Sequence, residues 1–79
     1  MAQVFAQHAS AGIYHLETRY VGPNKWEWFV LDAQQTSRTL FSGEAATLEG
    51  AKKDAAMHVG LYAELVNWMS IGPPIEVPD

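Results

Sequence analysis

The sequence contains no cysteine, so neither a disulfide framework nor thiolate chemistry is available to this chain of 79 residues. It is also poor in positive charge. Five Lys and Arg against nine Asp and Glu give a net charge of -4, which opposes attachment to phosphate backbones or anionic lipids. No apolar run approaches the roughly 20 residues that span a membrane, and the N-terminus has no signal-peptide pattern. We therefore expect a soluble, cytoplasmic protein.

Motifs that carry chemistry are missing as well. The sequence has no glycine-rich phosphate loop, nucleophile elbow, paired-histidine zinc motif or calcium loop. His8, His15 and His58 are spaced unlike metal ligands. Glu17 and Glu27 are candidate cross-strand neighbours, but exposed acids on strands usually add solubility rather than acid–base catalysis. We expect no enzymatic activity, no cofactor and no metal.

What the sequence does contain is enough apolar material for one small domain. The hydrophobic fraction is 48%, which is typical of a globular chain rather than a disordered one. A chain this short buries only about 60% of its unfolded surface, so its stability is modest unless it oligomerises. Self-association is therefore an attractive hypothesis from size alone.

One long helix is predicted over residues 47–70. Thr47 is a good N-cap, and Glu49 places a negative charge in the first turn, where it favours the free amide groups. Gly72, followed by two prolines, supplies a clear stop. Helical periodicity places Ala51, Ala55 and Tyr62 on the face that meets the rest of the core, which we call the core stripe.

A second apolar ridge points away from that face. It consists of Met57, Leu61, Leu65 and Trp68, which follow one another at helical spacing. A helix that covers one sheet cannot bury both faces. Either the N-terminal residues, particularly Val4 and Phe5, fold back over the ridge, or the ridge is a surface for self-association or for another protein. A third alternative is that the helix is rotated differently from this projection.

Three strands precede the helix, at residues 13–21, 26–33 and 37–42, with alternation typical of an antiparallel sheet. Pro23 and Asn24 favour a tight turn between the first two. The predicted fold class is therefore α+β, a three-stranded meander packed against one long C-terminal helix, β-β-β-α. We divide the chain into an N-terminal arm (1–12), this single domain (13–70) and a proline-rich flexible tail (71–79).

The second predicted strand is apolar on both faces, so one set of side chains must face away from the helix. If Phe29 and Leu31 face the helix, then Trp26, Trp28 and Val30 form an apolar strip on the open sheet face. With Arg19 beside it, this strip is a candidate platform for stacking nucleotide bases. The alternative is that one tryptophan is part of the core and that the arm or a second subunit covers the other.

Residues 26–30, 40–43 and 47–56 resemble the three-stranded-sheet-plus-helix pattern of the AP2 and integrase-arm DNA-binding domains. The last strand and the alanine-rich helix are also similar to the end of double-stranded RNA-binding domains. The resemblance covers about residues 13–69 in outline. It implies the β-β-β-α fold and a nucleic-acid contact through the sheet, for which only Arg19 and Arg38 are available here. The chain also resembles small bacterial proteins without an assigned activity.

Two functional hypotheses follow. The first is a non-catalytic protein-interaction module that associates with itself or with another protein, through the ridge or through the strip. The second is a nucleic-acid-binding module that uses the open sheet face. Acidic net charge and exposed apolar surface both favour the first, and neither suggests a membrane partner.

Overall fold

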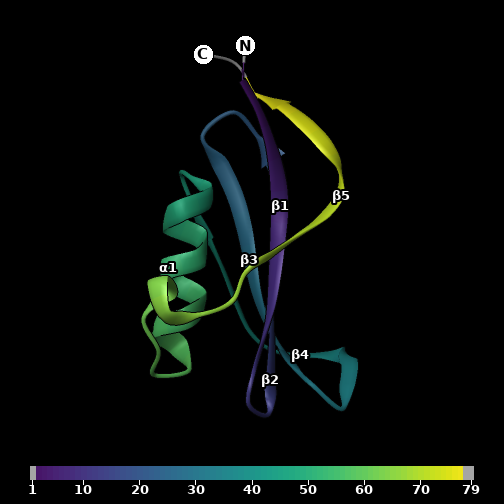
Figure 1. Cartoon of the computed structure of the whole chain (residues 1–79), viewed down its shortest axis with the longest axis vertical. Coiled ribbons are helices and arrows are strands. Elements are labelled where there is room, and N and C mark those ends of the chain that lie inside the picture. Colours follow the sequence, from purple (N-terminus) through teal and green to yellow (C-terminus); the bar gives the residue numbers. More distant parts are fainter. Residues whose placement is uncertain (1, 78–79) are drawn as a thin grey trace.

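The computed structural model describes residues 2–77 as one antiparallel sheet with a helix on one face (Figure 1). In chain order, the elements are β1 (Ala2–Ala11), β2 (Tyr14–Gly22), β3 (Lys25–Asp32), β4 (Gln35–Ala45), α1 (Leu48–His58), the 3-10 helix η1 (Ala63–Leu65) and β5 (Met69–Val77). The strand order is β4-β3-β2-β1-β5. The predicted three-stranded sheet with one long C-terminal helix is therefore wrong: the described chain has five strands and a short helix that is followed by a strand.

The three predicted strands nevertheless lie close to β2, β3 and β4. The turn between β2 and β3 contains Pro23 and Asn24, as expected. Asn24 has a φ of 57°, a left-handed conformation that asparagine tolerates better than most residues. The β2–β3–β4–α1 portion keeps the predicted order, and the errors lie in the end of the helix and in the two segments at the ends of the chain.

The first of these segments, predicted to be an arm, forms β1. Its alanines and glutamines have little intrinsic preference for strands. β1 forms because it lies between β2 and β5 and exchanges backbone hydrogen bonds with both. Pairing on two edges thus outweighs a weak local propensity.

The second segment, predicted to be a flexible tail, forms most of β5. β5 is an edge strand, where proline is tolerated because one edge of the strand needs no donor. The pairing with β1 jumps from Val4–Ile75 to Ala6–Ile71, so residues 72–74 bulge opposite Phe5. The bulge accommodates two prolines without breaking the strand. Pro78 and Asp79 lie outside the described residues.

The helix ends twelve residues before the predicted boundary, because Gly60 stops it. Gly60 has a φ of 76°. Its N–H donates to the Met57 carbonyl, and the N–H of Leu61 donates to the Ala56 carbonyl, each at 3.0–3.1 Å. This pair of bonds is the Schellman motif, with glycine at the position that requires a left-handed backbone. The predicted start is correct, since Thr47 is the N-cap and its Oγ1 accepts from the Gly50 N–H at 3.0 Å.

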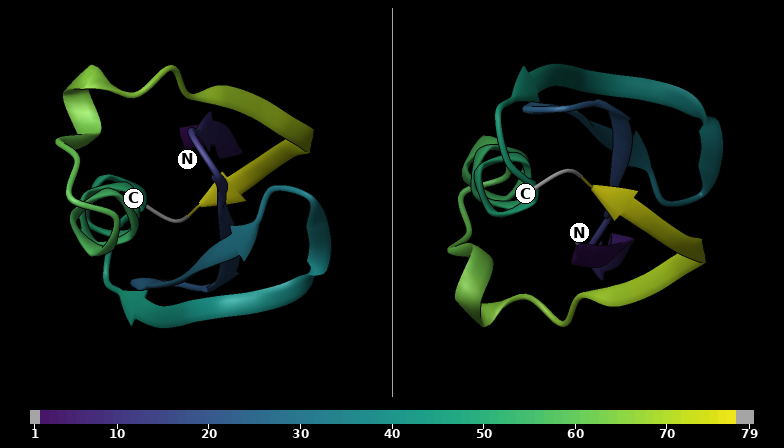
Figure 2. Two further views of the ribbon diagram at one scale, coloured as in Figure 1. Left: turned by 90° about the horizontal axis from the view of Figure 1, so that it is seen from below. Right: turned by 90° about the horizontal axis from the view of Figure 1, so that it is seen from above.

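The core lies between α1 and the sheet. Its buried side chains are Leu16, Trp26, Trp28, Val30, Ala51 and Ala55. The two alanines let α1 approach the sheet closely, and the larger side chains of β2 and β3 fill the space. Viewed along the long axis, β4 and β5 both reach towards the side opposite α1 (Figure 2). On this second face of the sheet, residues of both strands line a hollow of about 510 Å³.

The sheet is not continuous along its whole length. β1 and β2 pair only between the turn that joins them and the pair His8–Glu17. At the next position, hydrogen bonds from the Thr18 side chain take the place of backbone pairing. The Thr18 Oγ1 donates to the Gln7 carbonyl at 2.9 Å and accepts from the Gln7 N–H at 2.8 Å. Beyond this point the described parts of β1 and β2 share no ladder, while β1 still pairs with β5 and β2 with β3.

Candidate functional site

The strip of Trp26, Trp28 and Val30 is buried, not exposed. These side chains lie on the sheet face that α1 covers, and they retain 5%, 4% and 0% of their accessible surface. The prediction that they line the open face is therefore wrong, and the opposite set, Phe29 and Leu31, faces away from the helix. Both sets are apolar at the same period of two, so periodicity could not decide between them.

Trp28 shows how closely this side is packed. A Cβ on Gly43, the facing residue of β4, would lie 2.5 Å from Trp28 Cζ2, so only glycine fits there. The His58 ring at the end of α1 lies 4.6 Å from the Trp28 ring, centroid to centroid. The strip is thus core and offers no platform for a ligand.

Arg19, the charged member of the predicted platform, does lie on the open face. Its Nε donates to Glu27 Oε1 at 3.0 Å, and its guanidinium lies 5.4 Å from the centre of the Phe29 ring. Lys25 forms a similar pair with Glu44 at 3.3 Å. Arg19 and Lys25 thus each have an acidic partner within the protein, which reduces the positive charge that they can offer to a phosphate.

Two of the three histidines come together on adjacent strands. The rings of His8 and His15 meet edge to face with their centroids 5.3 Å apart, and His15 Nε2 is 3.1 Å from Glu17 Oε1. His58 lies elsewhere, against Trp28 and Phe41. Across residues 2–77, no group of three or more His, Asp or Glu side chains is arranged to hold a metal ion.

The predicted ridge is not a ridge on one helix. Only Met57 lies in α1, Leu61 follows its end, Leu65 closes η1, and Trp68 precedes β5. Even so, three of the four side chains are exposed, together with Tyr62: the exposed fractions are 60% for Met57, 39% for Leu61, 70% for Tyr62 and 78% for Leu65. We call these four residues the 57–65 surface.

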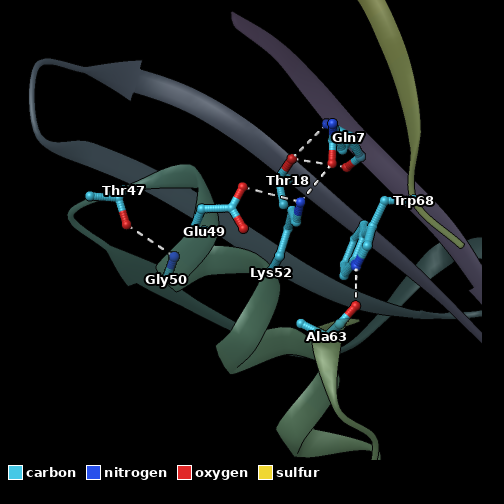
Figure 3. A network of polar contacts seen from close by, with 8 residues as sticks. All are labelled: Gln7, Thr18, Thr47, Glu49, Gly50, Lys52, Ala63 and Trp68. Carbon is cyan, nitrogen blue, oxygen red and sulfur yellow. Dashed lines mark hydrogen bonds and ion pairs between the residues drawn. The ribbon is translucent and has the colours of Figure 1, made fainter. Parts of the chain in front are cut away.

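Trp68 has a different role from its predicted neighbours. It is half-buried, and its Nε1 donates to the Ala63 carbonyl at 3.0 Å, which fixes the chain after η1 (Figure 3). The Lys52 ammonium lies 5.6 Å from the centre of its ring and donates to Gln7 Oε1 at 2.9 Å. Trp68 therefore holds the 62–68 segment against α1 and β1 and is not part of the exposed surface.

A groove of about 960 Å³ runs between α1 and this segment. It is bordered by Met57 and Tyr62, with Lys53 on the α1 side and Glu64 on the other. The 57–65 surface therefore continues into a concave region that carries charges of both signs. Sequence reasoning missed Tyr62, which it placed in the core stripe. Gly60 is the sequence feature that indicates the correct placement, because a glycine in a left-handed conformation ends a helix and changes the direction of the chain after it.

The 57–65 surface gathers four exposed apolar residues in one short segment, and two of them, Met57 and Tyr62, line the same groove. Four large apolar side chains within nine consecutive residues expose on the order of 500 Å², taking about 200 Å² for each when fully exposed. The largest apolar patch on a typical monomer is roughly 300–600 Å² and is often functional. A surface of this kind can bind another apolar surface.

Comparisons of the chain with protein-family models, curated proteins and solved structures return no match. Within residues 2–77, the structure has no helix with the length and hydrophobicity to cross a membrane.

Proposed function

We propose that this protein is a small, non-catalytic interaction module that self-associates through the 57–65 surface. The observation that carries the proposal is the exposure of Met57, Tyr62 and Leu65 beside a groove, whereas the apolar strip of Trp26, Trp28 and Val30 is buried. A second copy of the chain is the occupant we propose. Two copies would each cover the apolar side chains that water now meets.

The area supports a homodimer. A standard interface buries about 800 Å² on each partner. The roughly 500 Å² that these four residues expose would be about 60% of that area. The remainder would come from the polar residues that border the groove. An interface of this size is at the lower end for stable dimers, so we expect micromolar rather than nanomolar affinity.

The charges around the groove support the same occupant. Lys53 and Glu64 are both exposed and lie on opposite sides of it. In a two-fold interface the same patch meets itself, so Lys53 of one protomer can face the partner's Glu64, and the reverse. This pairing adds specificity more than affinity, because exposed ion pairs contribute little to binding.

We do not carry the nucleic-acid alternative further. Its platform required an exposed Trp26, Trp28 and Val30, and these side chains lie beneath α1. Its nearest cation, Arg19, is engaged by Glu27. The apolar side chains that suggested base stacking are therefore part of the core.

The test is the molar mass in solution, by light scattering over a concentration series, for the wild type and for Leu65→Glu. We expect the wild-type mass to rise towards twice the monomer mass with concentration. Leu65→Glu should raise the dissociation constant at least about tenfold, because a buried carboxylate without a partner is costly at an interface. Its folding should be unchanged, since Leu65 packs against little.

Met69→Glu is the matched control. Met69 is similarly exposed, at 65%, but it belongs to β5 and pairs with His8, outside the 57–65 surface. This variant should associate like the wild type. A wild-type mass that stays monomeric at all concentrations, or a dimer that Leu65→Glu leaves intact, would refute the proposal.

A further inference from the structure

The break in the sheet between β1 and β2 leaves two backbone edges facing each other without a ladder. Continuing the register His8–Glu17 would pair Phe5 with Tyr20 and Val4 with Val21, yet neither pair forms. The Thr18 bridge to Gln7 ends the ladder at the closed end of this gap. In the described chain, the N–H and C=O groups that point into the gap from residues 2–6 and 19–22 have no strand partner.

Side chains at the gap are also incompletely covered. Phe5 and Val21 remain 40% and 46% exposed, although each would gain a cross-strand neighbour if the sheet closed. On its other edge, Phe5 lies opposite the bulge at residues 72–74 of β5 and has no strand partner there either. Along this gap, the backbone groups lack strand partners and the apolar side chains are only partly covered, as on the edge strand of a sheet.

Hollows lie on both sides of the gap. On the face opposite α1, a hollow of about 510 Å³ is bordered by Ala6 and Ile75 on the β1 side and by Arg19 on the β2 side. On the helix side, a hollow of about 270 Å³ lies between Val4 and Tyr20. A strand places successive side chains on opposite faces, so the two hollows match the alternation of a strand that enters the gap.

We infer that the gap between β1 and β2 is a binding site for an extended segment of a partner polypeptide, inserted as an additional strand. Because β1 and β2 are antiparallel, the inserted strand pairs antiparallel with one of them and parallel with the other. Backbone hydrogen bonds supply affinity, and the two hollows select side chains. The segment should be apolar on both faces, with the larger side chains on the face opposite α1.

Insertion begins at the open end of the gap, near Ala2 and Gly22, and stops at Thr18. A full strand between two others needs edges about 10 Å apart, twice the spacing of neighbouring strands. The Thr18–Gln7 bridge holds the edges together at the closed end. The inserted segment is therefore short, about as long as residues 19–22.

The probe is a short synthetic peptide of valine and leucine residues flanked by lysines, with its ends blocked and one end labelled. We expect saturable binding by fluorescence anisotropy, and slower amide hydrogen exchange at residues 3–6 and 19–22 when the peptide is bound. The same peptide N-methylated at alternate residues should bind about tenfold more weakly or worse, because it has lost backbone donors.

Two variants separate this site from the 57–65 surface. Val21→Asp places a charge at the gap and should weaken binding at least about tenfold. Ile13→Asp, at an exposed position in the β1–β2 turn, should bind like the wild type. Leu65→Glu should also bind normally, so failure of the self-association proposal would not affect this result.

Two results would overturn the inference. One is the absence of saturable binding up to about 1 mM peptide, the weakest affinity that a specific site is expected to show. The other is equal binding of the N-methylated peptide, which would mean that apolar contact, and not strand pairing, holds it.

Discussion

Two apolar sets in this chain are candidate interaction surfaces by their sequence pattern, but they take opposite positions in the structure. Trp26, Trp28 and Val30 of β3 are buried beneath α1, whereas Met57, Tyr62 and Leu65 face water. Either set satisfies the criteria for an interaction surface when only its periodicity is considered. What separates them is the position of the helix, which covers β3 and ends before Leu61.

Gly60 determines that end. A helix running to residue 70 would carry Met57, Leu61 and Leu65 along one line, as the spacing predicts. Because Gly60 adopts a left-handed conformation, the chain after α1 turns back, and Trp68 anchors it to Lys52 and Ala63. The lesson is that one backbone position divides a continuous apolar pattern into a buried part and an exposed part.

Replacing Trp28 is the strongest test of the contrast between the buried and the exposed apolar set. Trp28→Ala should lower the free energy of unfolding by about 3–5 kcal/mol, since it removes a large side chain from the packed core. Urea denaturation followed by circular dichroism measures this change. For a domain of this size, such a loss is a large fraction of the total stability.

Tyr62→Ala is the corresponding variant in the exposed set. Its free energy of unfolding should lie within about 0.5 kcal/mol of the wild-type value. If both variants were equally mild, Trp28 would not be core and the contrast between the two sets would fail.

Gly60→Ala tests the position of the boundary. Alanine is strained at a φ of 76°, so we expect a loss of about 1–2 kcal/mol in the same urea experiment. Gly22→Ala is the control, because Gly22 has open space for a Cβ and no left-handed backbone, and its effect should be smaller. A stabilised Gly60→Ala, with higher helix content, would show that the helix continues past Gly60.

Tyr62→Ser has the smallest expected effect on stability but a clear effect on association. Its side chain is exposed, so unfolding should change by less than about 0.5 kcal/mol. In the proposed dimer the same ring is buried, and its loss should weaken association at least about tenfold, as is common for central aromatic residues. Analytical ultracentrifugation of the two proteins at matched concentrations provides the comparison.

The parts of the fold that were predicted correctly are those encoded locally. The Pro23–Asn24 turn and the Thr47 cap each depend on a few adjacent residues, and both are present. β1 was missed because its pairing partners, β2 and β5, supply what its own composition lacks. The orientation of β3 was missed because Phe29 and Leu31 are as apolar as the tryptophans, so only the tertiary position of α1 decides which face is covered.

For the candidate surface, the sequence identified Met57, Leu61 and Leu65 but attributed their exposure to a helical ridge. Trp68 fitted the same spacing, yet its indole N–H is bound to Ala63 and its ring lies against Lys52. Tyr62 was assigned to the core because the helix was extended past Gly60. Weighing that glycine as a stop signal would have corrected the helix end and the placement of Tyr62 together.

The most direct measurement is the methyl NMR spectrum of methionine-labelled protein over a dilution series from about 1 mM to about 10 µM, the range in which a modest interface dissociates. Met57 belongs to the 57–65 surface, and Met69 is exposed outside it. We predict that the Met57 methyl resonance shifts with concentration, along the same curve as the molar mass, while Met69 stays fixed. A Met57 resonance that does not move while the mass changes would place the interface elsewhere and contradict the account.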